Sequence, residues 1–179
     1  VLHKSRVIIR LNRYLTSTNL MHSSDDYDIV CRYPAFEVRL NKFSGQQGLF
    51  STESYNQGDT LIQFSIRSTQ PSPTYLTIQI GEAEHFEFEP DHLKYLNHSC
   101  NPNVFLDLTN HTLIAETAIE SGDELRFFYP STEWKMDQPF DCNCGAGNCL
   151  GSISGAHALS SAQLSNYKLS PYIQHKLTH

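Results

Sequence analysis

A run of closely spaced cysteines places the strongest constraint on how this chain can fold. The stretch CNCGAGNC, residues 142–149, contains Cys142, Cys144 and Cys149. Cys142 and Cys144 could not easily bond to each other, because a disulfide needs particular Cα and Cβ separations. Thiolates held close together suit a structural Zn²⁺, which takes four nitrogen or sulfur ligands in a tetrahedron. The segment therefore predicts a zinc site whose fourth ligand comes from elsewhere in the chain.

The other two cysteines, Cys31 and Cys100, lie far from this segment. Five cysteines in such an uneven distribution do not make the disulfide framework of a secreted protein. Cys100 belongs to YLNHSCNPN, residues 95–103, a polar stretch that also holds Asn97 and His98. Such a stretch is too polar for a core and too rich in specialised side chains for an idle loop. Cys31 lies outside every motif, and we expect it in the core.

Short apolar or alternating runs, interrupted by Gly, Pro, Asn and Ser, indicate a mainly β fold. Strands are predicted at RVIIRL (6–11), AFEVRL (35–40), QGLFST (47–52), DTLIQFS (59–65), YLTIQI (75–80), HFEFE (85–89), NVFLDL (103–108), HTLIAET (111–117) and DELRFFY (123–129). Short helices are predicted at PDHLKYL (90–96) and at SSAQLSNYKL (160–169), the latter capped by Ser160 or Ser161. A chain of 179 residues can bury one core, so we expect a single folded unit.

The charge balance bears on partners and location. A net charge of −6 disfavours direct nucleic-acid binding and favours a basic peptide or protein as partner. No apolar run approaches the roughly 20 residues of a membrane helix, so no membrane contact is expected. Residues 1–24 carry basic side chains and no acidic one. They form either an organellar targeting peptide or, as we favour, a strand and a polar loop, and we expect an intracellular protein, nuclear or cytoplasmic.

Three motifs occur together: YLNHSCNPN at 95–103, ETAIESGDELRFFY at 116–129 and CNCGAGNC at 142–149. On these motifs the chain resembles the SET-domain family of protein-lysine methyltransferases, in the branch with a post-SET zinc segment. The upstream stretch QQGLFSTESYNQGDTL, residues 46–61, is similar to the first motif of that family. The resemblance implies a mainly β SET-domain fold of several small curved sheets with short helices. It also implies a C-terminal pseudoknot, in which the chain passes through a loop.

The resemblance implies a division of the chain and an activity. The division is an N-terminal strand or extension at 1–35, a SET domain at 36–131, a post-SET zinc segment at 132–155 and a tail at 156–179. The activity is transfer of methyl groups from S-adenosylmethionine to a lysine side chain of a protein substrate, for example a histone. The alternative is a catalytically inactive SET-like module that binds a protein partner.

The chain departs from the family pattern at three places. Gln46 stands where the family usually has Gly, and the usual Tyr-x-Gly is absent from LIQFSIRST, residues 61–69. The second of these departures is the main support for the inactive alternative. Phe128 replaces the Asp that is common between the Phe and the Tyr of the family motif. Asp123 and Glu124 are interpreted as turn residues rather than catalysts.

The resemblance also implies ligands for the metal and for the cofactor. Cys100 joins Cys142, Cys144 and Cys149 around one structural Zn²⁺; the ordinary alternative is a buried apolar thiol. For S-adenosylmethionine, Asn97 meets the ammonium group and the backbone of His98 meets adenine. The backbone of Gln47 and Gly48 approaches the methionine end. The alternative for these residues is a polar turn with internally satisfied hydrogen bonds.

Tyr129 matches the catalytic tyrosine of the family, which also borders the cofactor, and Phe127 matches its product switch position. Only a neutral amine can attack the sulfonium methyl, yet a lysine with a pKa of about 10.4 is almost fully protonated at pH 7. An apolar aromatic channel disfavours the ammonium, and a phenol can align the amine without acting as a strong base. Both residues are otherwise ordinary strand aromatics. Trp134 and Phe140 either line this channel or pack in the core.

Overall fold

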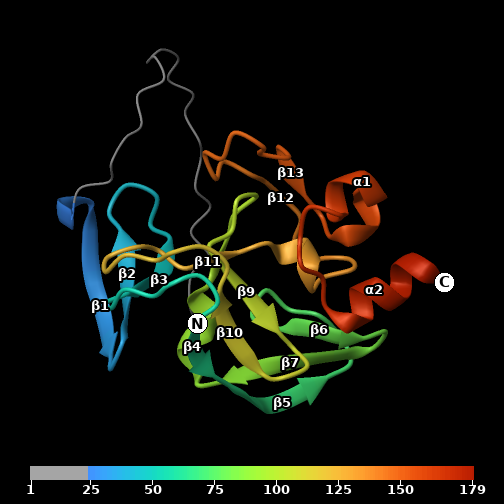
Figure 1. Cartoon of the computed structure of the whole chain (residues 1–179), viewed down its shortest axis with the longest axis horizontal. Helices are drawn as coiled ribbons and strands as arrows, with labels where there is room; N and C mark the ends of the chain where they lie inside the picture. The colour runs from blue at the N-terminus through green and yellow to red at the C-terminus, as the bar shows by residue number, and fades with distance from the viewer. Residues whose placement is uncertain (1–23) are drawn as a thin grey trace, which may run out of the picture.

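Short strands dominate the structure, a computed structural model that describes residues 24–179 (Figure 1). Within that range the three-stranded sheets are β1 (Tyr27–Tyr33), β2 (Phe36–Asn41), β3 (Gln47–Ser51); β4 (Thr60–Gln63), β10 (Thr112–Ala115), β9 (Val104–Asp107); and β5 (Ser65–Gln70), β7 (Glu84–Glu89), β6 (Ile78–Gly81). The two-stranded pairs are β8 (Asn97–His98) with β11 (Arg126–Phe127), and β12 (Phe140–Asp141) with β13 (Ser152–Ile153). The helices are η1 (Ser24–Asp26), η2 (Asp91–Tyr95), η3 (Tyr129–Ser131) and η4 (Ala156–Ala158), all 3₁₀, and α1 (Ser161–Leu164) and α2 (Pro171–Thr178). The prediction of a mainly β fold with small sheets and short helices is confirmed.

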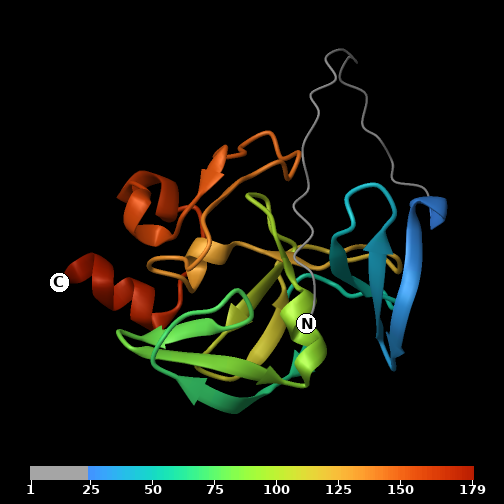
Figure 2. The same cartoon turned by 180° about the vertical axis from the view of Figure 1, so that it is seen from behind.

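The main hydrophobic core takes residues from all three of the larger sheets. Val38 and Leu49 come from the first sheet, Leu106 and Leu113 from the second, and Phe86 from the third. In β9 and β10 buried and partly exposed residues alternate, as the period of two in a strand dictates. In both views the first sheet lies at one side of the molecule, and the other two lie close together beside it (Figures 1 and 2).

The parallel pair β8–β11 brings together two segments that are distant in the sequence. Asn97 pairs with Arg126, and His98 pairs with Phe127. The segment that carries Asn97 is therefore a neighbour of the segment that leads into Tyr129, as the predicted fold requires. The threading of the chain through a loop stays a prediction.

The C-terminal part of the chain packs on the side away from the first sheet (Figures 1 and 2). It runs through the hairpin β12–β13 and then through η4, α1 and α2. Ser160 caps α1 in a capping box with Gln163, and Ser170 caps α2 ahead of Pro171. Among residues 24–179, none of the helices is long and apolar enough to span a membrane.

Two predicted elements lose more of their predicted length than the others do. Of the strand predicted at 123–129, only Arg126 and Phe127 pair as β11, and Tyr129 already begins η3. Pro130 follows at once, and proline has no N–H with which to continue a strand ladder. The helix predicted at 160–169 is reduced to the single turn of α1.

Several elements carried no clear signal in the sequence, among them β1, β5 and α2. Most side chains of β1 and β5 are exposed, so no hydrophobic alternation marks these strands, and β5 depends on its backbone ladder with β7. In α2 Ile173 is the buried residue. Cys31 lies on β1 and is exposed, so its predicted core position is wrong. The strand predicted at 6–11 lies outside the described residues.

Candidate active site and metal centre

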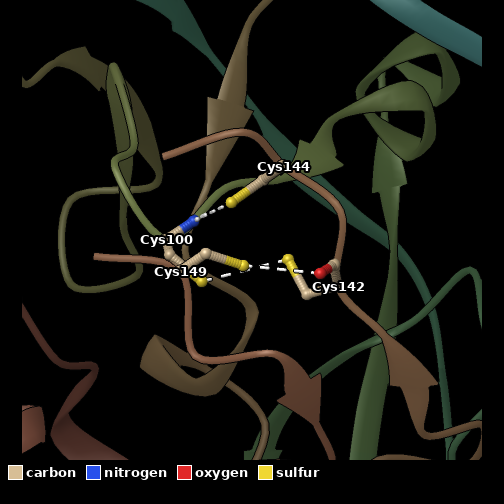
Figure 3. Close-up of side chains that lie close together, drawn as sticks. All are labelled: Cys100, Cys142, Cys144 and Cys149. Atoms are coloured by element: carbon tan, nitrogen blue, oxygen red, sulfur yellow. Dashed lines mark hydrogen bonds between the residues drawn. The ribbon is translucent and has the colours of Figure 1, made fainter. Parts of the chain in front are cut away.

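Four cysteine side chains point toward one another (Figure 3). Cys100 comes from the loop after β8, whereas Cys142, Cys144 and Cys149 come from the segment between β12 and β13. Their sulfur atoms all lie within 4.8 Å of one another, with 3.9 Å between the Sγ atoms of Cys100 and Cys142. Four sulfurs in a tetrahedron around Zn²⁺, with Zn–S distances of about 2.3 Å, are about 3.8 Å apart. The arrangement therefore fits a zinc site, and none of the four thiols is in a disulfide.

Backbone N–H groups support the sulfur atoms of this cysteine cluster. The N–H of Cys100 donates to Sγ of Cys144 over 3.5 Å, and the N–H of Leu150 donates to Sγ of Cys100 over 3.4 Å. Burial raises the pKa of the Cys100 thiol to about 11, so its thiolate needs positive charge nearby. A divalent cation supplies that charge, and the N–H donors add to it. The donor set suits a closed structural site, because protein ligands fill all four positions.

Hydrogen-bond acceptors surround the side-chain amide of Asn97. Its Nδ2 donates to the carbonyl oxygen of Gln47 over 2.9 Å and to Oε1 of Glu124 over 2.7 Å. Gly48 adjoins both groups: a Cβ atom there would lie 2.5 Å from Oε1 of Glu124 and 3.0 Å from Nδ2 of Asn97. The structure thus brings together three residues that the sequence proposed as cofactor contacts, Gln47, Gly48 and Asn97. Glu124 and Asn97 can approach the backbone this closely because position 48 has no side chain.

Glu124, interpreted from the sequence as a turn residue, becomes a further candidate site residue because it contacts Asn97. Its side chain is 13% exposed and also accepts from Nε of Arg126 over 2.7 Å. A surface hollow of about 290 Å³ opens beside these two side chains. No local pattern marks Glu124, because its partner Asn97 lies in a different motif. Asp123, by contrast, does act as a turn residue, since its Oδ2 accepts from the N–H of Glu120 over 2.9 Å.

The imidazole of His98 connects the cysteine cluster to Tyr129. Its Nδ1 accepts from the N–H of Tyr129 over 3.2 Å. Its Nε2 must then carry the proton, and it faces Sγ of Cys100 at 3.4 Å. Burial lowers the pKa of His98 to about 4, so the ring is neutral at neutral pH. The side chain of His98 thus links the cysteine cluster to Tyr129. The backbone of His98, which the sequence analysis assigned to adenine binding, belongs to β8.

Tyr129 lies in aromatic surroundings and is held at both ends. Its hydroxyl donates to the carbonyl oxygen of Leu96 over 3.0 Å. The ring of Phe127 is 4.8 Å away between centroids, and that of Phe140 is 6.1 Å away. Burial raises the pKa of the Tyr129 phenol, so the hydroxyl keeps its proton at neutral pH. The phenol can therefore orient a substrate group, and it is a poor general base.

Three consecutive aromatic residues face three different surroundings. Phe127 belongs to the main core, Phe128 to a second cluster formed with the tail, and Tyr129 packs against both the main core and the cysteine cluster. Phe127 and Phe128 join different clusters, as successive residues of extended backbone do, whereas Tyr129 already begins η3. Trp134 joins the tail cluster, so it is a packing residue, whereas Phe140 lies beside Tyr129.

Glu133 is a buried carboxyl group that no sequence motif indicated. Its Oε1 accepts from the N–H of Gln79 over 3.0 Å and from the hydroxyl of Thr132 over 3.1 Å. Burial raises the pKa of Glu133 to about 7, although both hydrogen bonds act in the opposite direction. The group is therefore partly protonated at neutral pH.

Comparisons with known proteins point to one family. A family model described as SET domain matches residues 22–130. Methyltransferase flvH of Aspergillus flavus is 42% identical over 106 residues, which cover 58% of this chain and 59% of that protein. A histone-lysine N-methyltransferase, H3 lysine-36 specific, of Aspergillus fumigatus is 40% identical over 68 residues, which cover 35% of this chain and 7% of that protein. The crystal structure of the methyltransferase domain of human histone-lysine N-methyltransferase SETMAR aligns with a TM-score of 0.49 and 20% identity, over 67% of this chain and 58% of that chain. The chain thus spans less than two thirds of the length of each of these proteins.

Proposed function

Because the chain belongs to the SET-domain family, we propose that it is a protein-lysine N-methyltransferase that uses S-adenosylmethionine as methyl donor. The observation that carries the proposal is that a polar environment and an aromatic environment lie next to each other. The acceptor cluster at Asn97 and the aromatic surroundings of Tyr129 meet through the β8–β11 pair. The similarity to Methyltransferase flvH and to the H3 lysine-36 specific enzymes supports the same activity.

The residues around Asn97 fit the charged end of the cofactor. An ammonium group needs acceptors, and the carbonyl of Gln47, the amide of Asn97 and the carboxylate of Glu124 provide them. Gly48 lets the side chains of Glu124 and Asn97 approach its backbone closely. When bound, S-adenosylmethionine supplies a methyl group on a positively charged sulfur. We assign its binding to these residues, to the backbone of His98 and to Tyr129.

The aromatic side of the site is assigned to the substrate lysine. At a pKa of about 10.4, deprotonating a lysine at pH 7 costs about 4–5 kcal/mol. The rings of Phe127, Tyr129 and Phe140 disfavour the ammonium form and so reduce this cost. The hydroxyl of Tyr129 donates to Leu96, and its oxygen can still accept from the amine. Tyr129 thereby orients the nitrogen lone pair, and the proton of the amine passes to solvent.

We assign one structural Zn²⁺ to Cys100, Cys142, Cys144 and Cys149. Four thiolates leave no coordination position for water, so the metal has no part in methyl transfer. Its role is to tie the segment between β12 and β13 to the loop after β8. Phe140, in β12, lies just before that segment, so the metal also holds one wall of the aromatic surroundings.

The substrate is proposed to be a basic protein. A net charge of −6 favours association with a positively charged peptide, and histones are such proteins. The similarity to H3 lysine-36 specific enzymes makes histone H3 the first candidate. An intracellular location, nuclear or cytoplasmic, is part of this proposal.

The test is a methyl-transfer assay with the full chain. Radiolabelled S-adenosylmethionine is incubated with histones, ribosomal proteins and cell lysate, and the Tyr129→Phe variant serves as the control. We expect label on lysine in at least one protein with the wild type and much less with the variant. The missing Tyr-x-Gly supports the alternative of an inactive protein-binding module. Calorimetry with S-adenosylmethionine distinguishes that alternative from the enzyme. Absence of both cofactor binding and label would overturn the proposed activity.

A further inference from the structure

The C-terminal tail, residues 156–179, is firmly packed although it lies outside the part of the chain that matches the family model. Leu164 and Ile173 of the tail are 1% and 0% exposed. They form a hydrophobic cluster with Phe128, which directly follows β11. The tail therefore has a defined docking place next to the candidate active site.

Backbone contacts reinforce this docking. The N–H of Ser170 donates to the carbonyl of Ser131 over 2.8 Å, which joins the start of α2 to the end of η3. The N–H of Ala156 donates to the carbonyl of Glu133 over 2.8 Å. The short segment that follows Tyr129 is thus bonded to the tail at two places.

Tyr167 connects the tail with both parts of the site. Its ring stacks on Phe128, with 3.6 Å between centroids and 7° between planes. Its hydroxyl donates to the carbonyl oxygen of Cys100 over 2.8 Å. Nδ2 of Asn148, which lies within the cysteine-rich segment, donates to the same oxygen over 2.8 Å. One carbonyl at a metal-ligand position is therefore held from two directions, and Tyr167 provides one of them.

We propose that residues 156–179 form a strap and that Tyr167 is its positioning residue. Cys100 is two residues from His98, and Phe128 precedes Tyr129. By holding Cys100 and Phe128 together, Tyr167 keeps the cysteine cluster and the phenol of Tyr129 in a fixed relation. The strap acts through the stacking of Tyr167 on Phe128. This contact needs an aromatic or apolar side chain at position 128. The consequence for catalysis rests on the proposed methyl transfer, whereas the consequence for metal retention does not.

The experiment compares zinc release from the full chain in three variants. Tyr167→Phe removes the hydrogen bond to Cys100, and Tyr167→Ala also removes the stacked ring. Tyr172→Phe is the matched control, because the hydroxyl of this second tail tyrosine donates to Glu82 over 2.9 Å and not to Cys100. Transfer of Zn²⁺ to a chromogenic chelator should be about threefold faster for Tyr167→Phe and about tenfold faster for Tyr167→Ala. Tyr172→Phe should release zinc at the wild-type rate.

Each outcome decides for or against the strap. Release from Tyr167→Ala at the wild-type rate overturns it, and so does equally fast release from Tyr172→Phe. If Tyr167→Ala does not fold, as judged by circular dichroism, Tyr167→Phe decides the question because it keeps the ring. In metal-free protein the same order is expected in the rate at which a maleimide modifies Cys100, which is 0% exposed. Equal labelling rates in all variants count against the strap.

A catalytic readout separates positioning from general stability. For Tyr167→Ala we expect about a tenfold lower kcat with unchanged cofactor affinity, and for Tyr167→Phe recovery of most of that loss. If the wild type transfers no methyl groups while zinc release follows the expected order, the proposed function fails and the strap stands. If methyl transfer is normal in every variant and zinc release is uniform, the strap fails and the proposed function stands.

Discussion

The hydroxyl of Tyr129 donates to the backbone carbonyl of Leu96 over 3.0 Å, so the chain segment before β8 fixes the orientation of the phenol. Tyr129→Phe loses this alignment and is expected to lower kcat about a hundredfold, because small misplacements at a reacting centre are costly. Cofactor affinity should be unchanged, since the ring remains. Steady-state methyl transfer and calorimetry measure the two quantities. Tyr75→Phe, at a tyrosine that is 75% exposed, is the control, and full activity in Tyr129→Phe would remove this residue from the mechanism.

Asn97 and Glu124 are expected to act together on the cofactor. Asn97→Ala removes one polar partner of the ammonium group and should weaken S-adenosylmethionine binding about tenfold to a hundredfold. Glu124→Gln keeps an oxygen for Asn97 and removes the negative charge, so a smaller loss is expected. Calorimetry at fixed salt measures both affinities. Asn101→Ala, at an exposed residue of the loop that follows β8, should bind as the wild type does, and equal binding by Asn97→Ala would contradict the assignment.

Phe127 is expected to control the number of methyl groups added. Its ring is 4% exposed and 4.8 Å from that of Tyr129, between centroids. A Tyr at this position can anchor a water that crowds the amine, and one such hydrogen bond is worth about 1 kcal/mol. The wild type should add two or three methyl groups, and Phe127→Tyr should shift the products toward monomethyl without affecting cofactor binding. Mass spectrometry of a methylated peptide reads the products. Phe43→Tyr, at a phenylalanine that is 83% exposed, is the control, and a wild type that stops at one methyl group refutes the switch.

Removal of the metal is expected to affect substrate binding more than the core. The four sulfur atoms lie together, but three of them belong to a segment that is outside the main core. Chelation should therefore weaken peptide binding and loosen the segment around Phe140, while the unfolding of the main core changes little. Fluorescence binding assays and hydrogen exchange measure the two effects. Elemental analysis should find one zinc per chain, and freshly purified active protein without zinc would count against the site.

Because of Glu133, the free energy of unfolding is expected to fall as the pH rises. Its folded pKa of about 7 lies above the ordinary value of 4.5, so its contribution is fully present below about pH 4.5 and is lost as the pH rises through 7. Glu133→Gln keeps an acceptor oxygen for Gln79 and Thr132 and cannot ionise. The variant should be close to the wild type in stability at pH 5 and more stable by about 1–3 kcal/mol at pH 8. Urea unfolding at the two pH values tests this, and a difference that does not grow with pH contradicts the buried carboxyl group.

Much of the candidate site could be predicted because its chemistry is contiguous in the sequence. The three cysteines at 142–149 and the run from Asn97 to Cys100 keep their ligand types whatever path the chain takes. The alternating strands β9 and β10 were likewise readable, since burial on one face imposes a period of two. Phe127 and Tyr129 were identified by their motif, although Tyr129 begins a 3₁₀ turn at the point where Pro130 ends the ladder.

The tertiary structure decided which distant residues meet. Glu124 was interpreted as a turn residue, but the return of the chain places it against Asn97. Nothing in the sequence around Phe128 indicated that Tyr167 of the tail stacks on its ring. The exposed strands β1 and β5 depend on backbone ladders, which leave no hydrophobic pattern in the side chains. A sequence motif records local periodicity and side-chain chemistry, whereas these contacts join segments that are neighbours only after the chain has folded.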